Sequence, residues 1–444
     1  LSARDIAMNV ALPEVDGRIM SRAVSFKAEA RFDPRVQASV VEYAPAPDRI
    51  AFVADLARNW ADLRRTPAAQ RRFAVVLANY PNRDGRLANG VGLDVPEGVA
   101  VTLERLAAEG YAVEPVADGA ALMDLLRAGP TNAPGARSGA VRFGLEAYHA
   151  FLETLPAAAR AALEDRWGAP EDDPFVADGA FVLPAHVRGN AVIAVQPARG
   201  YNIDPVASYH DPDLVPPHGY LAFYAWLRRD FGAQAVIHFG KHGNLEWLPG
   251  KALALSAECW PEVALGPLPH LYPFIVNDPG EGTQAKRRAQ AVIVDHLTPP
   301  LTRAESYGPL RDLEQLVDEY YLAAGMDPRR LEPLKREILF LAQSAALDKD
   351  IGLKPDADED DQLQQLDAYL CELKELQIRD GLHIFGRAPQ GDLAADLRRD
   401  RECRGHVGVR GHAGHCARHP RKCGRSGRAA ASGPLSRPQD SKVS

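Results

Sequence analysis

The chain has 444 residues, of which 46 % are apolar and 25 % charged, and its formal net charge is −7. This composition is typical of a globular protein, and the length suggests roughly two to four domains. No run of about 18 apolar residues and no basic segment followed by an apolar one occurs, so we expect neither a membrane span nor a secretory signal. Five cysteines are too few for a disulfide framework, which favours a cytoplasmic protein.

The charge is unevenly distributed along the chain. Residues 401–444 contain ten Lys or Arg and two acidic residues, which gives this tail about +8 and the rest about −15. An acidic body lacks the basic stripe that nucleic-acid binding needs, so we expect no nucleic-acid partner and no membrane partner.

The tail also differs in composition. It has one Leu and no Ile, Phe, Tyr or Trp, so it cannot bury a core, and we expect residues 396–444 to be disordered or frameshifted. Its Cys and His residues have metal-like spacing, but the apolar residues that pack when a structural zinc binds are missing. Because the chain starts at Leu1 in mid-pattern, we also expect it to be a fragment.

A first set of elements predicts a βαβ unit. Residues 72–79 form an apolar, β-branched run typical of a strand, residues 99–109 have helical periodicity, and residues 111–115 predict a second strand. A region rich in Gly, Pro and Ala follows at 128–190, with one helix predicted at 143–167.

A second α/β set follows. We predict strands at 192–196, 235–239, 271–276 and 292–296, and helices at 220–231 and 281–291. Loops follow the carboxyl ends of the strands, where open α/β sheets bind their ligands. From 303 to about 382 the pattern is mainly helical.

These patterns predict a multidomain α/β protein with Rossmann-like βαβ units, followed by a mainly helical segment. The expected organisation is the end of an upstream domain, two α/β units, a helical segment and the tail, with boundaries at 1–68, 69–185, 186–302, 303–395 and 396–444.

The most informative motif is His-Phe-Gly-Lys-His-Gly-Asn-Leu-Glu-Trp at 238–247. Two imidazoles and a carboxylate, His238, His242 and Glu246, suit a divalent first-row metal or could accept protons from a weak N–H acid. Two glycines argue against a continuous helix and would let the backbone approach a bulky ligand. The alternative is a strand-to-loop corner whose histidines bond backbone carbonyls.

Two further loops have candidate binding residues. In the loop after 192–196, Arg199 could form a forked bond to a carboxylate or a structural ion pair. The loop at 277–288 enters a helix with three cations, which suggests an anion site. No Walker A motif occurs, so we expect no ATP hydrolysis by this chain.

Long contiguous strings resemble the large subunits of aerobic cobaltochelatase and magnesium chelatase, the CobN and magnesium chelatase large-subunit family. The resemblance covers residues 1 to about 395 and is strongest at 7–19, 77–96, 238–256, 259–310 and 366–386. The residues at Lys241, Asn244 and Trp247 favour the cobalt enzyme.

The resemblance implies the tetrapyrrole-binding subunit of an enzyme that inserts Co²⁺ into hydrogenobyrinic acid a,c-diamide in cobalamin biosynthesis. ATP and Mg²⁺ would be used by AAA+ ATPase partner subunits of the CobS and CobT type. The catalytic and transient metal-binding residues would be His238, His242 and Glu246. The substrate-binding residues would be Arg199, Tyr201, His218, Lys241, Asn244, Trp247, Lys251, Asn277, Glu281 and Arg287.

Two alternatives remain open on the sequence alone. One is the large subunit of magnesium chelatase, which inserts Mg²⁺ into protoporphyrin IX. The other is an inactive fragment that only binds a tetrapyrrole.

Overall fold

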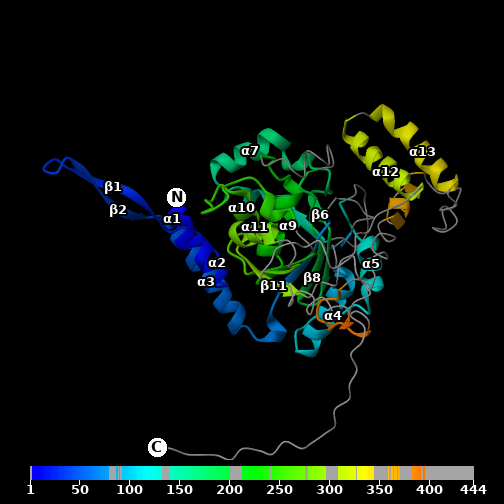
Figure 1. Cartoon of the computed structure of the whole chain (residues 1–444), viewed down its shortest axis with the longest axis horizontal. Coiled ribbons are helices and arrows are strands. Elements are labelled where there is room, and N and C mark those ends of the chain that lie inside the picture. Colours follow the sequence, from blue (N-terminus) through cyan, green and yellow to red (C-terminus); the bar gives the residue numbers. More distant parts are fainter. Residues whose placement is uncertain are drawn as a thin grey trace, which may run out of the picture. The chain divides into compact units, whose positions relative to one another are not determined.

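A computed structural model gives the fold of the chain (Figure 1). It describes residues 3–79, 87–88, 90, 93–132, 141–200, 213–240, 243–275, 279–296, 309–326, 328–344, 359, 362–363, 365–367, 369–370, 383–391 and 394–395. The chain divides into two compact units, Leu1–Gln390 and Gly391–Ser444. All elements below belong to the first unit, and the predicted tail at 396–444 lies outside the described residues.

A six-stranded sheet in the order β11-β10-β9-β3-β8-β7 organises this unit. Its strands are short apolar runs because helices cover both faces, and β3 and β8 are buried at every position. β7 pairs antiparallel with β8 at one edge, and the other five strands are parallel. The strands are β3 (Phe73–Leu77), β7 (Ala185–Arg188), β8 (Ala191–Val195), β9 (Ala235–Phe239), β10 (His270–Ile275) and β11 (Ala291–His296).

Helices form a layer on each face of the sheet. Alternate side chains of β3 pack on one face with α9 (His218–Arg229) and α10 (Trp260–Leu265), and on the other with α4 (Val95–Ala108) and α5 (Gly119–Ala128). The Asp94 side chain caps α4 by accepting a hydrogen bond from the backbone N–H of Glu97. The predicted α/β class is confirmed, and five of the predicted strands form the parallel part of the sheet.

Two local predictions are wrong. Residues 111–115 form no strand but a single bridge from Val113 to Gly189, and the Tyr111 ring packs edge-on against Phe73. The helix predicted at 143–167 is β4 (Val141–Gly144), α6 (Leu145–Leu152) and α7 (Ala157–Trp167), because Pro156 precedes α7 and cannot continue a helix.

β4 belongs to a small antiparallel sheet that the sequence patterns did not reveal. It pairs with β6 (Ala180–Leu183), which in turn pairs with β5 (Val176–Ala177). These strands have only two to four residues, too few for an alternating pattern to be recognised.

Residues 3–65 form helices and a two-stranded ribbon whose strands belong to a different sheet from the central one. The ribbon strands are exposed at nearly every position, including Phe26, Phe32 and Tyr43. The elements are α1 (Ala3–Ile6), a π-helical turn (Ala7–Ala11), α2 (Leu12–Val15), β1 (Ser25–Asp33), β2 (Ala38–Pro45) and α3 (Pro47–Arg65).

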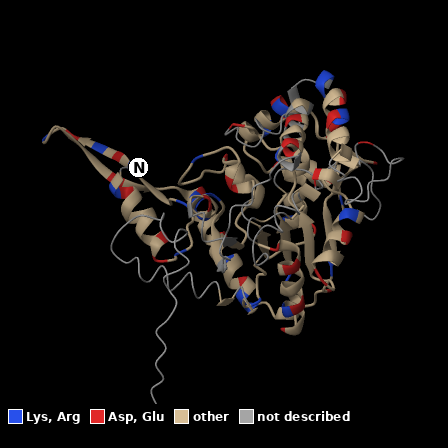
Figure 2. Cartoon of the chain, turned by 45° about the vertical axis from the view of Figure 1, so that its right-hand side comes forward, with Lys and Arg blue, Asp and Glu red and all other residues tan. Residues whose placement is uncertain are grey.

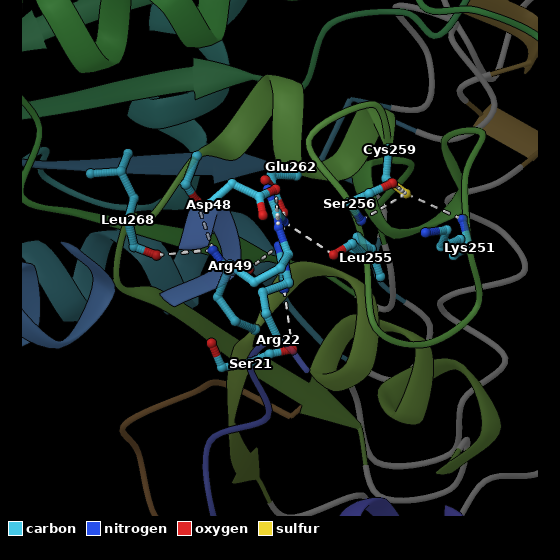
Figure 3. A network of polar contacts seen from close by, with 12 residues as sticks. Ser21, Arg22, Asp48, Arg49, Lys251, Leu255, Ser256, Cys259, Glu262 and Leu268 are labelled. Carbon is cyan, nitrogen blue, oxygen red and sulfur yellow. Dashed lines mark hydrogen bonds and ion pairs between the residues drawn. The ribbon is translucent and has the colours of Figure 1, made fainter. Parts of the chain in front are cut away.

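A buried ionic cluster joins this segment to α10 (Figure 3). One carboxylate oxygen of Glu262 accepts hydrogen bonds from Nε of Arg22 at 2.6 Å and from Nη1 of Arg49 at 2.7 Å. Arg22 also donates to the side chain of Gln290, and Arg49 donates to the carbonyl of Leu255. Burial lowers the pKa of Arg22. Removing the shared carboxylate would leave the buried Arg22 guanidinium without this counter-charge, whereas Arg49 would keep its ion pair with Asp48 at 2.9 Å.

The described residues that follow the sheet, up to residue 344, are mainly helical, in agreement with the prediction for this part of the chain. α12 (Pro309–Met326) and α13 (Leu331–Ser344) share an apolar cluster that includes Leu313 and Ile338. Strands from both predicted α/β ranges, 69–185 and 186–302, lie in the one central sheet, and the domain boundaries stay a prediction.

Lys or Arg positions and Asp or Glu positions occur along the same helices in the coloured ribbon (Figure 2). Within the described part of the chain, every helix is too short or too polar to cross a bilayer.

We expect the isosteric change Glu262→Gln to lower the free energy of unfolding by about 3 kcal/mol or more, because it leaves a buried charge uncompensated. Urea unfolding followed by circular dichroism measures this, and proteolysis of residues 1–65 detects local release. Glu258→Gln, the same change at an exposed position just before α10, is the control. Equal stability of the two variants would contradict the expectation.

Candidate functional site

The order of the strands singles out one position at the carboxyl edge of the sheet. From the central strand β3 the chain passes to β8 on one side, and then crosses to β9 on the other and continues to β10 and β11. The direction therefore reverses between β3 and β9, which is where doubly wound folds bind ligands. Residues 196–200 follow β8, and the 238–247 motif begins in the last two residues of β9, whose carboxyl end lies at the same edge.

Glycines allow the loops at this edge to lie close together. Gly240 has φ +146°, and a Cβ built there would lie 2.5 Å from Cβ of Ala78. A Cβ on Gly243 would lie 2.8 Å from Nε2 of Gln196. These glycines therefore serve close contact between neighbouring loops, whereas the sequence had suggested the approach of a bulky ligand.

Two buried histidines form the base of the site. Nδ1 of His238 on β9 lies 2.7 Å from Nε2 of His270 on β10, and Nδ1 of His270 lies 2.9 Å from the carbonyl oxygen of Ala289. Burial lowers the pKa of His270 to about 4, and burial followed by the neighbouring His270 lowers that of His238. Both imidazoles are neutral near pH 7.

Side chains from β8 and α9 connect His238 to the next loop. The Tyr224 hydroxyl lies 3.2 Å and Nε2 of Gln196 lies 3.4 Å from Nε2 of His238. Oε1 of Gln196 accepts a hydrogen bond from the backbone N–H of Asn244 at 3.1 Å. The Tyr220 hydroxyl donates to Oδ1 of Asn244, and Nδ2 of Asn244 donates to the carbonyl of Pro197. Asn244 is thus held on three sides.

Glu246 is fully buried in the short helix η5 (Leu245–Trp247). Its Oε1 accepts hydrogen bonds from the backbone N–H of Gly243 at 3.1 Å and from the Tyr272 hydroxyl at 3.3 Å. Burial, followed by the Glu246 carboxylate, raises the pKa of Tyr272 well above its usual value, so this phenol stays a proton donor. A buried carboxylate held by two donors is the strongest proton-accepting candidate among the described site residues.

Arg288 fixes the loop that carries Glu246. It extends from α11 (Pro279–Ala289) and donates to the carbonyl oxygens of Glu246, Leu248 and Lys251 at 2.6–3.1 Å. Burial lowers the pKa of Arg288. Three backbone acceptors on one guanidinium hold this loop in a single conformation.

Four predicted site residues lie in this cluster: Arg199, His238, Asn244 and Glu246. Arg199 is buried and close enough to Tyr220 to lower the pKa of that phenol, against the larger opposing effect of burial. His238 and Glu246 are linked through Tyr272, whose ring lies 5.6 Å from His238 and whose hydroxyl bonds Glu246. The described residues contain no group of three or more His, Cys, Asp or Glu arranged to hold a metal ion.

Other predicted site residues lie elsewhere. His218 bonds Tyr148 and the carbonyl of Gly168 in the core, Lys251 is exposed, and Trp247 is partly exposed. Glu281 lies in the first turn of α11. Tyr201, Lys241, His242 and Asn277 lie outside the described residues.

The predicted combination of a helix start and three cations does not form. Lys286, Arg287 and Arg288 occupy the last turn of α11, where cations suit the helix dipole, and not its first turn. Arg287 pairs with Glu14 at 2.6 Å, and Lys286 donates to the carbonyl of Glu14. These contacts attach the N-terminal segment to α11.

Sequence reasoning missed several members of the cluster: Gln196, Tyr220, Tyr224, His270, Tyr272 and Arg288. Two tyrosines four residues apart in an otherwise apolar helix, and a histidine at the start of a buried strand, were available signals. Which of these side chains come into contact depends on the order of the strands in the sheet, and the sequence pattern does not predict that order.

The buried histidines predict how stability depends on pH. The pKa of His270 in the folded chain, about 4, lies below its ordinary value of 6.5. The contribution of His270 to the free energy of unfolding is therefore fully present above pH 6.5. It is lost as the pH falls toward 4, because the unfolded chain takes up the proton first. In that window we expect the free energy of unfolding to fall by about 1.4 kcal/mol per pH unit from this group. Urea unfolding at pH 7, 6 and 5 measures the slope, and the same slope in His270→Gln would contradict this origin.

Comparison with known proteins agrees with this architecture. A family model described as CobN/Magnesium Chelatase matches residues 1–399. The chain is 64 % identical over 399 residues to the aerobic cobaltochelatase subunit CobN of Sinorhizobium sp, covering 89 % of this chain and 31 % of that relative. It is 35 % identical over 344 residues to the magnesium-chelatase H protein of Chlorobaculum parvum, covering 77 % of this chain and 27 % of that relative.

A solved structure of the catalytic subunit of cobaltochelatase from Mycobacterium tuberculosis is also similar. Its TM-score is 0.64 at 44 % sequence identity, with 89 % of this chain and 34 % of that chain covered. The chain therefore spans about a third of the length of these relatives. Since the family model matches nearly nine-tenths of the sequence, this chain belongs to the CobN/Magnesium Chelatase family.

Proposed function

We propose that this chain is part of the tetrapyrrole-binding subunit of an ATP-dependent cobaltochelatase. The reaction is insertion of Co²⁺ into hydrogenobyrinic acid a,c-diamide, a step of cobalamin biosynthesis in the cytoplasm. The observation that carries the proposal is the buried carboxylate of Glu246 near the reversal of strand order, where it and the buried Arg199 both lie close enough to Tyr220 to affect its pKa. The higher identity to a CobN subunit than to a magnesium-chelatase subunit favours cobalt.

The chemistry of metal insertion explains why these groups suit the task. Ring nitrogens lose protons as the metal enters, which requires a base, and the metal must lose water. Glu246 can accept a proton or contact the incoming cation, because a carboxylate does both. Arg199 can bond a side-chain carboxylate of the macrocycle. A direct role for His242 remains a prediction from the family resemblance.

ATP would act through partner subunits. The sequence has no Walker A motif, so the energy for desolvating the ion and distorting the ring would come from AAA+ ATPase subunits of the CobS and CobT type, which use ATP and Mg²⁺. Their movement would change the site around Glu246, while the chemistry stays with groups of this chain.

Magnesium chelatase activity is the second candidate, because a magnesium-chelatase subunit is also a relative. The two are distinguished by the metal and tetrapyrrole that the full-length protein uses together with its ATPase partners. Insertion of Mg²⁺ into protoporphyrin IX, with no insertion of Co²⁺, would replace the cobalt proposal.

Binding can be tested on this chain. We expect hydrogenobyrinic acid a,c-diamide to bind saturably, as measured by pigment absorbance or tryptophan fluorescence. Arg199→Gln should weaken binding about tenfold or more, since a charge-assisted hydrogen bond contributes about 1.5–3 kcal/mol. Arg188→Gln, on the edge strand β7, is the matched control. Equal affinity of the two variants would remove Arg199 from the site.

Catalysis requires the full-length protein with its ATPase partners. We expect Glu246→Gln to reduce cobalt insertion about 100-fold or more, because an amide cannot take the proton, while ATP hydrolysis continues. An unchanged insertion rate would contradict the role of Glu246. Binding by this chain together with no insertion by the full-length complex would favour a protein that only binds tetrapyrrole.

A further inference from the structure

We infer that His238 and His270 are positioning residues, a pair of neutral imidazoles whose hydrogen bonds hold Gln196, and through it Asn244 and the Glu246 turn, at the carboxyl edge of the sheet. The inference rests on the proposed function for its catalytic consequence. It departs from the sequence-based expectation, in which His238 was a metal ligand or base.

The carbonyl oxygen of Ala289 stands at one end of this chain of contacts and determines which atom donates in each hydrogen bond. The carbonyl of Ala289 can only accept, so Nδ1 of His270 carries a proton and donates to it at 2.9 Å. In a neutral ring, Nε2 of His270 is then the acceptor for Nδ1–H of His238 at 2.7 Å. Nε2 of His238 is therefore itself an acceptor.

The contacts at the other end are compatible with the same arrangement. The backbone N–H of Asn244 can only donate, so the Gln196 atom that it contacts at 3.1 Å is the carbonyl Oε1. The amide Nε2 of Gln196 consequently faces His238, where it needs an acceptor. The Tyr224 hydroxyl approaches the same nitrogen of His238 at 3.2 Å. The carbonyl of Ala289 thus specifies the tautomers, and the orientation of Gln196 that the Asn244 N–H fixes is compatible with them.

A second proton on either imidazole would require the hydrogen bonds of this chain of contacts to be rearranged. A proton on Nε2 of His270 would meet the N–H of His238 within the 2.7 Å separation. A proton on Nε2 of His238 would face the amide of Gln196. Both ring nitrogens of His238 are already engaged and the side chain is 2 % exposed, so a cobalt ion could bind it only after these bonds break.

The consequence is mechanical coupling among five elements. The contacts run from α11 through β10, β9 and β8 to the loop after β9, with Tyr224 of α9 alongside. Gly243 lies in the same turn and donates to Glu246, so a shift of Gln196 would move the Glu246 carboxylate. Residues that orient a reactive group in this way typically affect activity 10- to 100-fold when replaced.

The tautomers can be measured directly on this chain, independently of any activity. Imidazole ¹⁵N chemical shifts of the histidine-labelled chain should show His238 and His270 protonated at Nδ1 only, and unchanged between pH 7 and 6. Tyr224→Phe, which removes one donor to Nε2, assigns the His238 signal. A charged His238, or one protonated at Nε2, would overturn the inference.

The catalytic consequence is tested with two His238 variants in the full-length complex. His238→Gln keeps an acceptor at the position of Nε2, whereas His238→Asn loses it. We expect His238→Asn to lower kcat about 10- to 100-fold with KM for Co²⁺ within twofold, and His238→Gln to retain most of kcat. His186→Gln, on β7 of the same sheet, is the control for replacing a histidine outside this network.

The outcomes separate this inference from the proposed function. An equal loss of kcat in both His238 variants would overturn the positioning role of His238. A tenfold rise in KM for Co²⁺ in both variants would also overturn that role, and would indicate that His238 is a metal ligand. If the unaltered complex inserts no cobalt, the proposed function fails, while the ¹⁵N measurement still decides the protonation of the pair.

Discussion

The arrangement of the site depends on one constraint: polar groups buried between the ends of parallel strands must satisfy one another without water. Helices cover both faces of the sheet, so His238, His270, Gln196 and Asn244 have no solvent to bond. Each therefore needs a protein partner in a defined direction, and a chain of such partners has few solutions. The rigidity of the Glu246 turn follows from this requirement, which makes the hydrogen-bond network as important as the apolar packing below it.

A second constraint is steric. Loops leaving adjacent strands start only about 4.8 Å apart, so side chains cannot all be accommodated where they cross. Gly240 meets this requirement between the adjacent strands β9 and β3, because a Cβ there would collide with Ala78. A Cβ on Gly243 would collide with Gln196, which follows β8 one strand further along. The glycines of this motif thus have a structural explanation within the fold. Arg288 in turn fixes the loop that follows the motif, by donating hydrogen bonds to the carbonyl groups of that loop.

Much of the α/β architecture could be predicted because buried parallel strands are short apolar runs with clear ends. The strand at 235–239 was predicted with its observed bounds. Residues 111–115 were wrongly predicted to form a strand, because apolar residues there pack beside the sheet and do not pair within it. The N-terminal ribbon escaped notice because its strands are exposed and have no alternating burial pattern.

The site could be predicted only in part, for a related reason. Residues close together in the sequence, such as His238 and Glu246, can be recognised as a motif. Gln196 and His270 lie near His238 only because of the order of the strands in the sheet. Residue type was also misleading. A histidine followed by another and by a carboxylate suggests a metal site, yet the protonation of His238 is decided by a carbonyl on α11 that no spacing rule includes.

The exposed ribbon of β1 and β2 has a practical consequence. Phe26, Phe32, Val41 and Tyr43 are uncovered, and the outer edge of a two-stranded ribbon presents unpaired backbone groups. Edges of this kind recruit further strands, so the isolated chain should self-associate as its concentration rises. Preparations will behave best when kept dilute, or when a lysine is introduced on the ribbon to discourage edge-to-edge pairing.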